Sequence, residues 1–205
     1  WIADRLIGSQ MAVWYGGIII MSGHVLLAIP NDNTFFIGLI LVVLGTGLLK
    51  PNIGAMVGQL YSLEDERRDA GYTLYYMGIN LGSIIGYLVC GWLQLNAGYH
   101  WAFGAAAIGM GVGLVQFRLT LYKLDGQGSM PTQPLSTAAH RNSKIAILTS
   151  VVMLCAVTIL MLSGGISVNP VTLAQYIATT ITAVFLAYYA GIYAFADLTS
   201  NEKRS

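Results

Sequence analysis

The stretch Leu44-Gly-Thr-Gly-Leu-Leu-Lys50-Pro51-Asn52-Ile-Gly54 places a lysine, a proline and an asparagine side by side near the middle of an apolar run. A lysine ammonium in a bilayer core is costly and is seldom left facing lipid. Pro51 has no N–H to donate to the carbonyl of Gly47, and its ring crowds that turn of a helix. We therefore expect a helix break here and a water-accessible cavity that Lys50 lines. The alternative is that the Lys50 side chain extends to the lipid headgroups.

The composition indicates a membrane protein. Of the 205 residues, 56% are hydrophobic and only 9% are charged, whereas an ordinary soluble domain carries about 25% charged residues. The few charges lie in short segments between apolar runs of about twenty residues, which is long enough to span a bilayer. We therefore predict an all-α polytopic membrane protein in contact with the lipid bilayer. The chain has no basic patch or aromatic stacking platform, so we expect no nucleic acid partner.

Loops divide the chain into six apolar spans. The spans cover about residues 12–29, 35–61, 70–95, 100–121, 145–162 and 171–195. A polar linker, 122–143, separates the fourth span from the fifth, and its Gly, Pro and Ser content is typical of a surface loop. The last two spans form a predicted hairpin around Gly164-Gly165 and Asn169-Pro170, and a polar tail from Ser200 to Arg204 follows.

The loop charges predict the orientation of the chain in the membrane. Of the 10 Lys and Arg residues, one is Lys50, and all the others lie in loops on one side. The loops on the other side, around 30–34, 95–99 and 163–170, have no Lys or Arg. Because cytoplasmic loops carry an excess of positive residues, we expect a multi-pass protein of the cell membrane with both ends of this chain in the cytoplasm.

The third span carries two faces of different character. One face is polar, and its members recur every three or four residues as on one side of a helix: Tyr72, Tyr76, Asn80, Ser83 and Tyr87. The other face consists of small residues that let a neighbouring helix approach closely: Gly78, Gly82 and Gly86. Gly54 and Gly58 offer a similar packing patch on the Lys50 helix. These faces suit a helix that lines a cavity, and the alternative is an aromatic stripe packed in the core.

Opposite charges lie at the cytoplasmic ends of two neighbouring spans. Asp4 and Arg5 precede the first span, and Arg67, Arg68 and Asp69 precede the third. Such charges can hold one conformation and separate in another. The alternative is ordinary solvated loop charge, because exposed ion pairs contribute only about 0–1 kcal/mol. The residues alone favour this alternative.

The sequence contains no motif typical of catalysis. We find no nucleotide-binding glycine loop, no metal-ligand spacing and no Ser/His/Asp set. We therefore expect no enzyme, no catalytic residue, no bound cofactor and no metal. What remains is a cavity lined by one cation, one amide and several phenols. Such a cavity suits a zwitterionic or anionic polar solute with apolar parts.

Four motifs resemble one known family. The stretch Tyr72-Thr-Leu-Tyr-Tyr76-Met-Gly-Ile-Asn80-Leu-Gly-Ser-Ile84 is similar throughout to the signature of the proton-dependent oligopeptide transporters, within the major facilitator superfamily. Three further stretches match, in the right order: Trp1-Ile-Ala-Asp4-Arg5-Leu-Ile-Gly8, Gly45-Thr-Gly-Leu-Leu-Lys50-Pro51-Asn52 and Arg67-Arg68-Asp69-Ala-Gly71. The final hairpin resembles, by position, the extra helix pair that bacterial members carry between their two bundles.

The resemblance implies a fragment of a transporter with two helical bundles. Residues 1–121 correspond to the amino-terminal bundle from the end of its second helix to its sixth, 122–143 to a cytoplasmic linker, and 144–205 to the extra hairpin and the start of the next linker. The resemblance implies that two parts of the same transporter are missing from this chain and are its partners. They are the first helix, which carries the family's Glu-x-x-Glu-Arg-Phe motif, and the carboxy-terminal bundle. We therefore expect these 205 residues alone not to transport.

The resemblance also implies roles for individual residues. Lys50 meets the peptide carboxylate or pairs with an acidic residue of the other bundle, and Tyr72, Tyr76 and Asn80 belong to the substrate site. Tyr76 and Asn80 hold the peptide backbone or its amino end. Asp4, Arg5 and Arg68 belong to the cytoplasmic gate.

The implied function is symport of di- and tripeptides with protons, driven by the proton gradient. Two alternatives stay open. One is a transporter of another solute, such as nitrate, an amino-acid derivative or a drug, on the same fold. The other is a membrane receptor that does not transport.

Overall fold

The computed structural model describes residues 1–62, 64–163 and 169–195. Its elements are η1 (Ala3–Ile7), α1 (Ser9–Leu27), α2 (Asp32–Gln59), α3 (Arg67–Ala97), α4 (Tyr99–Thr120), η2 (Leu121–Leu124), α5 (Thr137–Leu162) and α6 (Pro170–Phe195). η1 is a π-helical turn and η2 a 3-10 turn. The described residues contain 6 helices long and apolar enough to cross a membrane, which confirms the predicted fold class.

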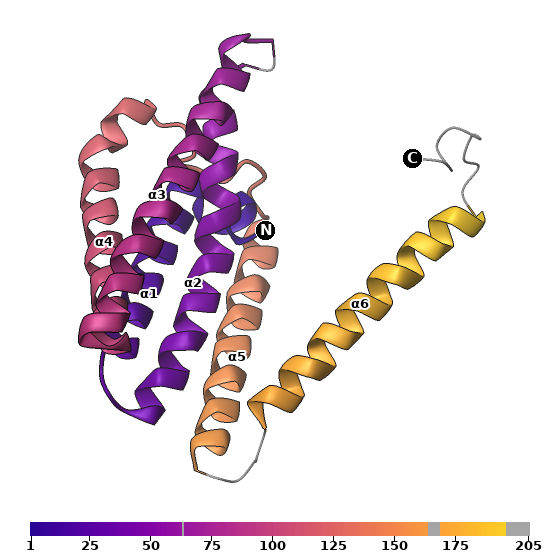
Figure 1. Cartoon of the computed structure of the whole chain (residues 1–205). Helices are drawn as coiled ribbons and strands as arrows, with labels where there is room; N and C mark the ends of the chain where they lie inside the picture. Colours follow the sequence, from indigo (N-terminus) through magenta and orange to yellow (C-terminus); the bar gives the residue numbers. More distant parts are fainter. Residues whose placement is uncertain (63, 164–168, 196–205) are drawn as a thin grey trace. The chain divides into compact units, whose positions relative to one another are not determined.

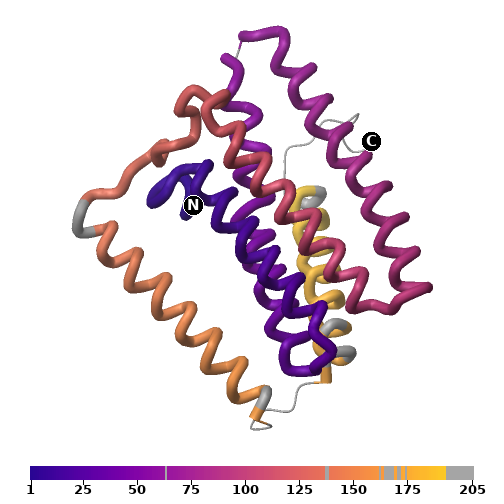
Figure 2. The backbone as a smooth tube through the Cα atoms, turned by 90° about the vertical axis from the view of Figure 1, so that its left-hand side faces the viewer, coloured from indigo at the N-terminus to yellow at the C-terminus, as the bar shows by residue number. Residues whose placement is uncertain are grey.

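The chain forms two compact units, Trp1–Ser150 and Val151–Ser205. In the first unit α1 packs against both α2 and α4, and α4 packs against α3 (Figures 1 and 2). The contact between α2 and α3 is much smaller. The second unit contains the end of α5 and all of α6. The predicted turn at Gly164-Gly165 and the polar tail from Ser200 to Arg204 lie outside the described residues.

Glycines bring α1 and α2 together at two levels. A Cβ added to Gly45 would lie 2.6 Å from the carbonyl oxygen of Gly16, and one added to Gly38 would lie 2.8 Å from that of Gly23. Because the later glycine of α1 meets the earlier glycine of α2, the two helices run antiparallel. Small residues allow backbones in a membrane to pack this closely. Sequence reasoning missed this contact, although the matching seven-residue spacing in both helices was a visible signal.

Each turn between the helices of the first unit has a local cause. The Asn31 side chain accepts a hydrogen bond from the N–H of Asn33 at 2.9 Å, which caps the start of α2. Gly98 joins α3 to α4 with φ of 97°, a backbone conformation that glycine adopts readily. Asp65 accepts a hydrogen bond from the N–H of Arg67, the first residue of α3, at 2.9 Å.

Two features differ from the sequence prediction. The predicted helix break at Pro51 is wrong, because α2 continues through Pro51 to Gln59. A proline removes one hydrogen bond from a helix, and the residues on both sides of Pro51 remain helical. The second difference concerns the end of the linker: α5 begins at Thr137, inside the stretch predicted as linker.

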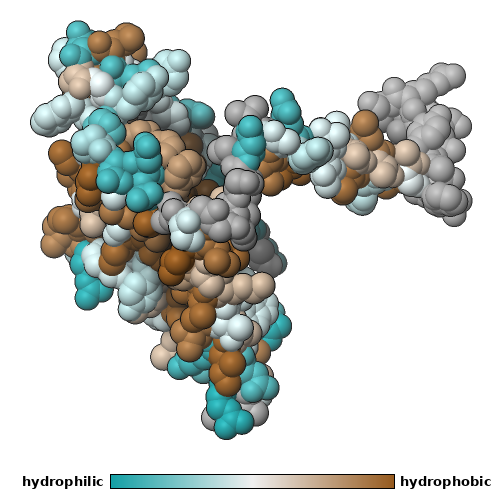
Figure 3. Space-filling view, turned by 90° about the horizontal axis from the view of Figure 1, so that it is seen from below, coloured by the Kyte–Doolittle hydropathy of each residue, from teal (hydrophilic) through white to brown (hydrophobic). Residues whose placement is uncertain are grey.

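The surface is apolar over the helices. Large side chains are exposed along α3, among them Leu81 (58%), Leu88 (66%) and Leu95 (85%). Seen from below, the space-filling view shows hydrophobic residues among polar ones on the surface (Figure 3). Water-soluble monomers rarely expose large contiguous apolar patches. The exposed apolar surface therefore fits helices that contact lipid or other helices.

Candidate functional site

Lys50 lies on an exposed face of α2. Both Lys50 and Pro51 are exposed, whereas Asn52 is half-buried. The Asn52 amide donates a hydrogen bond to the carbonyl of Leu48. No ion pair involves Lys50 within the described parts of the chain. The described residues therefore leave the ammonium open to a partner or ligand rather than neutralised inside a core.

Tyr72 is the predicted substrate residue that contacts α2. Its hydroxyl donates a hydrogen bond to the carbonyl of Gly54 at 3.4 Å. A Cβ added to Gly58 would lie 2.5 Å from that hydroxyl. Gly54 and Gly58, which the sequence predicts as a packing patch, both lie near tyrosine hydroxyls of α3. The patch therefore faces a tyrosine side chain and not the backbone of a closely packed helix.

Tyr76 and Asn80 lie on the open surface of α3. Tyr76 is 59% exposed, and Asn80 is exposed as well. No hydrogen bond, ion pair or ring contact joins either residue to Lys50 among the described residues. The structure therefore places Tyr72 against α2 and leaves Tyr76, Asn80 and Lys50 on exposed helix surfaces.

Tyr75 is a neighbour of this site that sequence reasoning missed. A Cβ added to Gly54 would lie 3.8 Å from the Tyr75 hydroxyl, so Tyr75 approaches the same patch as Tyr72. Its ring centroid lies 5.3 Å from that of Tyr76. The signal was available: residues three apart share a helix face, so Tyr75 follows Tyr72 onto the glycines of α2.

The glycine face of α3 has no partner in the described part of the chain. A Cβ added to Gly78, Gly82 or Gly86 would meet nothing within 4 Å there. The close approach of another helix, expected from the sequence, is therefore not made by the helices described. α3 presents both its polar face and its glycine face openly.

The predicted gate residues lie at the ends of α1 and α3, but they do not pair with one another. Asp4 and Arg5 belong to η1, and the Asp4 carbonyl accepts a hydrogen bond from the N–H of Gln133 at 2.9 Å. The Arg68 guanidinium lies 6.0 Å from the centre of the Tyr72 ring. Its Nε is buried and has no hydrogen-bond partner among the described residues. Arg68 therefore contacts the tyrosine of the substrate set rather than Asp4.

Arg67, next to the predicted gate, forms an ion pair with Asp65. The Arg67 Nη2 and the Asp65 Oδ2 are 2.8 Å apart, and the Arg67 side chain is 81% exposed. Hydrogen bonds from Arg67 lower the pKa of the Asp65 carboxyl below its ordinary value. This pair fixes the turn before α3 and leaves Arg68 free to face α2.

The polar segment after η2 is anchored to the start of α1. The N–H of Gln10 donates to the carbonyl of Gly128 at 2.9 Å, and the Gln10 side chain donates to the carbonyl of Gln127 at 2.8 Å. Gly8, with φ of 81°, allows this approach, because a Cβ there would lie 2.8 Å from the Gly128 carbonyl oxygen. Sequence reasoning treated this segment as a simple surface loop and missed the contact. Glycines at 8, 126 and 128 were its only signal.

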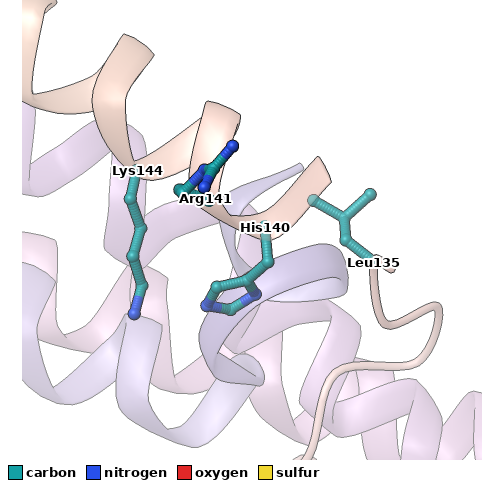
Figure 4. A pocket seen from close by; sticks show the side chains of 4 residues that line it. All are labelled: Leu135, His140, Arg141 and Lys144. Carbon is teal, nitrogen blue, oxygen red and sulfur yellow. The ribbon is translucent and has the colours of Figure 1, made fainter. Parts of the chain in front are cut away.

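A pocket of about 430 Å³ lies where the polar segment meets α5. It is lined by Leu135, His140, Arg141 and Lys144. The His140 and Lys144 side chains, one helical turn apart, point to the same side of α5, and Arg141 points another way (Figure 4). None of these residues belongs to the predicted substrate site or gate.

Comparison with known proteins identifies similar chains. A family model described as PTR2, POT family, matches residues 10–153. The peptide transporter YePEPT of Yersinia enterocolitica subsp. palearctica serotype O:3 (strain YE-P4) is 38% identical over 98% of this chain and 41% of its own length. The di-/tripeptide transporter of Lactococcus lactis subsp. lactis (strain IL1403) is 36% identical over 100% of this chain and 41% of its own length.

A solved structure shares the fold. The crystal structure of peptide transporter POT in complex with sulfate matches with a TM-score of 0.78 and 36% identity. The match covers 100% of this chain and 42% of that chain. This chain therefore spans about two-fifths of the length of the proteins it resembles.

Proposed function

This chain belongs to the POT family, and from that membership we propose that it forms part of a transporter that carries di- and tripeptides across the cell membrane together with protons. The observation that supports the proposal is the match over nearly the whole chain to proteins named peptide and di-/tripeptide transporters. The exposed Lys50 and the open polar face of α3 supply suitable groups for a peptide. The family and its members named here are transporters, so no catalytic step is needed.

Lys50 is the residue best suited to bind the peptide carboxylate or an acidic residue of the rest of the transporter. A lysine held near mid-membrane without an ion-pair partner in the described residues needs an anion to offset the cost of removing its charge from water. Tyr72, Tyr76 and Asn80 offer hydroxyl and amide groups that both donate and accept hydrogen bonds. These groups suit the amino end and the backbone of a short peptide.

The proposed orientation places the start of α1, the turn before α3 and the polar segment after α4 in the cytoplasm. All three carry Arg or Lys, and the turns at 28–31 and 98 carry none. Asp4, Arg5 and Arg68 are then cytoplasmic, where we propose that they belong to a gate. Alternating access requires such a gate to close on one side while the other side opens.

We propose the proton gradient as the energy source. Protonation of acidic groups changes which of two conformations is favoured, and a downhill proton flow then drives the peptide uphill. The described helices supply the peptide-binding side of this cycle. No bound cofactor is required for it.

The test uses the full-length protein that contains this chain, reconstituted in liposomes. We expect a labelled dipeptide to accumulate only when an inward proton gradient is imposed. The Lys50→Ala variant should lose that accumulation, because a charge-assisted hydrogen bond to the carboxylate contributes about 1.5–3 kcal/mol, or about ten- to hundredfold in affinity.

The outcomes separate the claims. Gradient-driven uptake that is unaffected by Lys50→Ala would keep the function and remove Lys50 from the site. If no dipeptide enters under either condition, although the protein is folded and inserted, the substrate assignment is wrong.

A further inference from the structure

Pro51 leaves one backbone carbonyl in the middle of α2 without its helical donor. In an α-helix the carbonyl of residue 47 accepts a hydrogen bond from the N–H of residue 51, and Pro51 has no N–H. No side chain in the described parts of the chain donates to the Gly47 carbonyl. The nearby Asn52 amide donates to Leu48 instead. An unsatisfied carbonyl is costly at membrane depth unless water or a ligand reaches it.

The Gly47 carbonyl lies beside an exposed stretch of α2 that includes Lys50. Because this carbonyl is directed toward the turn of residues 50 and 51, its surroundings are set by Lys50 and Pro51, and both are exposed. Gly47 is also exposed, and a Cβ added there would meet nothing within 4 Å among the described residues. Gly47 and Lys50 are three residues apart, so their Cα atoms lie ~4.5 Å apart along the helix axis. The carbonyl that lacks its usual helical donor and the lysine therefore belong to the same turn of α2.

We propose that the Gly47 carbonyl oxygen is a substrate contact that accepts a hydrogen bond from the amide N–H of the bound peptide. The inference rests on the proposed function and adds a second contact beside Lys50. In a dipeptide the amide nitrogen is bonded to the carbon that carries the carboxylate. A carboxylate at Lys50 thus places this N–H one short step away, near position 47. Pro51 prevents the helix from using the acceptor, so the acceptor is left for the ligand.

The substrate can be changed at the single group that this contact needs. Alanyl-lactate has an ester oxygen where dialanine has its amide N–H, and the two charged ends are the same. The ester cannot donate, and its oxygen faces the carbonyl oxygen with like partial charge. In the full-length protein we expect dialanine to inhibit uptake of a labelled dipeptide about three- to tenfold more strongly than alanyl-lactate, which corresponds to one hydrogen bond.

Pro51→Ala gives the Gly47 carbonyl a helical donor. We expect the preference for dialanine over alanyl-lactate to fall toward equality in this variant, and also in Pro51→Gly. A general change in helix shape would weaken both ligands alike and leave their ratio unchanged. Asn52→Ala is the matched control, because it removes the hydrogen bond to Leu48 and leaves the Gly47 carbonyl free. Its ratio should stay at the wild-type value.

Three results are decisive. Equal inhibition by the two ligands in the wild-type protein overturns the inference. A preference that survives in a folded Pro51→Ala or Pro51→Gly protein overturns it as well, because another group then accepts the peptide N–H. Absence of any dipeptide uptake by the wild-type protein contradicts the proposed function itself. A ratio that is lost in the proline variants and kept in Asn52→Ala supports the contact.

Discussion

At the scale of single residues, glycine acts in two different ways in this chain. At Gly45 it allows two helix backbones to touch, since a Cβ there would lie 2.6 Å from the Gly16 carbonyl oxygen and 2.8 Å from the Ile20 nitrogen. At Gly113 a Cβ would meet nothing within 4 Å among the described residues. The two positions have the same residue type and helical setting, but only the first is constrained by packing.

Gly45→Ala should therefore destabilise the full-length protein, because the backbone atoms of α1 that it meets cannot move aside cheaply. Overpacking of this kind costs about 1–3 kcal/mol. Gly113→Ala is the matched control and should be neutral or slightly stabilising, because alanine favours the helix by up to about 1 kcal/mol. Melting temperatures of the two variants in detergent measure the difference. Equal melting temperatures would show that α1 and α2 do not pack through Gly45.

The Asp65–Arg67 ion pair responds to pH only under acidic conditions. Arg67 lowers the pKa of the Asp65 carboxyl below its ordinary value of 3.8. Any stabilisation from this pair is therefore present above that value and is lost only as the pH falls through the lowered pKa. Asp65→Asn should change the melting temperature by the same amount at about pH 5 and about pH 8. If Asp65→Asn changes the melting temperature by different amounts at these two pH values, Asp65 interacts with a group other than Arg67.

At the scale of secondary-structure elements, most of the helices were predictable because an apolar run of about twenty residues is typical of a membrane-spanning helix. The ends of α1 to α4 lie within a few residues of the expected spans. The predicted break at Pro51 is wrong, because a proline removes only one hydrogen bond and the neighbouring turns of a long helix tolerate that loss. The early start of α5 was missed because Thr137, His140 and Arg141 are polar residues at the beginning of a helix.

The anchored polar segment gives a prediction at the same scale. Gly8→Ala adds a Cβ 2.8 Å from the Gly128 carbonyl and strains a backbone with φ of 81°. The segment should then detach from α1, and trypsin should cleave faster after Lys123. Gly98→Ala is the control: it strains a backbone with φ of 97°, but its Cβ meets nothing within 4 Å in the described chain. Equal cleavage rates in both variants would attribute the effect to backbone strain alone.

At the scale of the whole molecule, the candidate site was predicted as a set of residues but not as an arrangement. Sequence motifs identify Lys50, Tyr72, Tyr76 and Asn80, whereas only the structure shows that Tyr72 packs on Gly54 and that the other three are exposed. Periodicity places residues on a face of one helix. It cannot say which helix that face meets, so the Gly16–Gly45 contact and the role of Tyr75 were missed.

The open polar face of α3 gives a prediction for the full-length transporter. If this face lines the substrate cavity, a cysteine on it is reached by water, whereas a cysteine on the opposite face is covered by lipid or protein. Ser83 lies on the polar face and Ile85 on the opposite face, and both are exposed in the structure. In a protein whose Cys90 and Cys155 are replaced by serine, Ser83→Cys should react quickly with a charged, water-soluble maleimide, and Ile85→Cys slowly.

Dipeptide should protect the cysteine at position 83, because a bound substrate occupies the space beside it. Peptide that cannot bind, such as one with both ends blocked, should give no protection, since it lacks the carboxylate that Lys50 is proposed to hold. Quick labelling without protection would mean that water reaches this face but the peptide binds elsewhere. Slow labelling at position 83 would mean that the tyrosine stripe of α3 packs in the interior, and the cavity would then have to be formed by other helices.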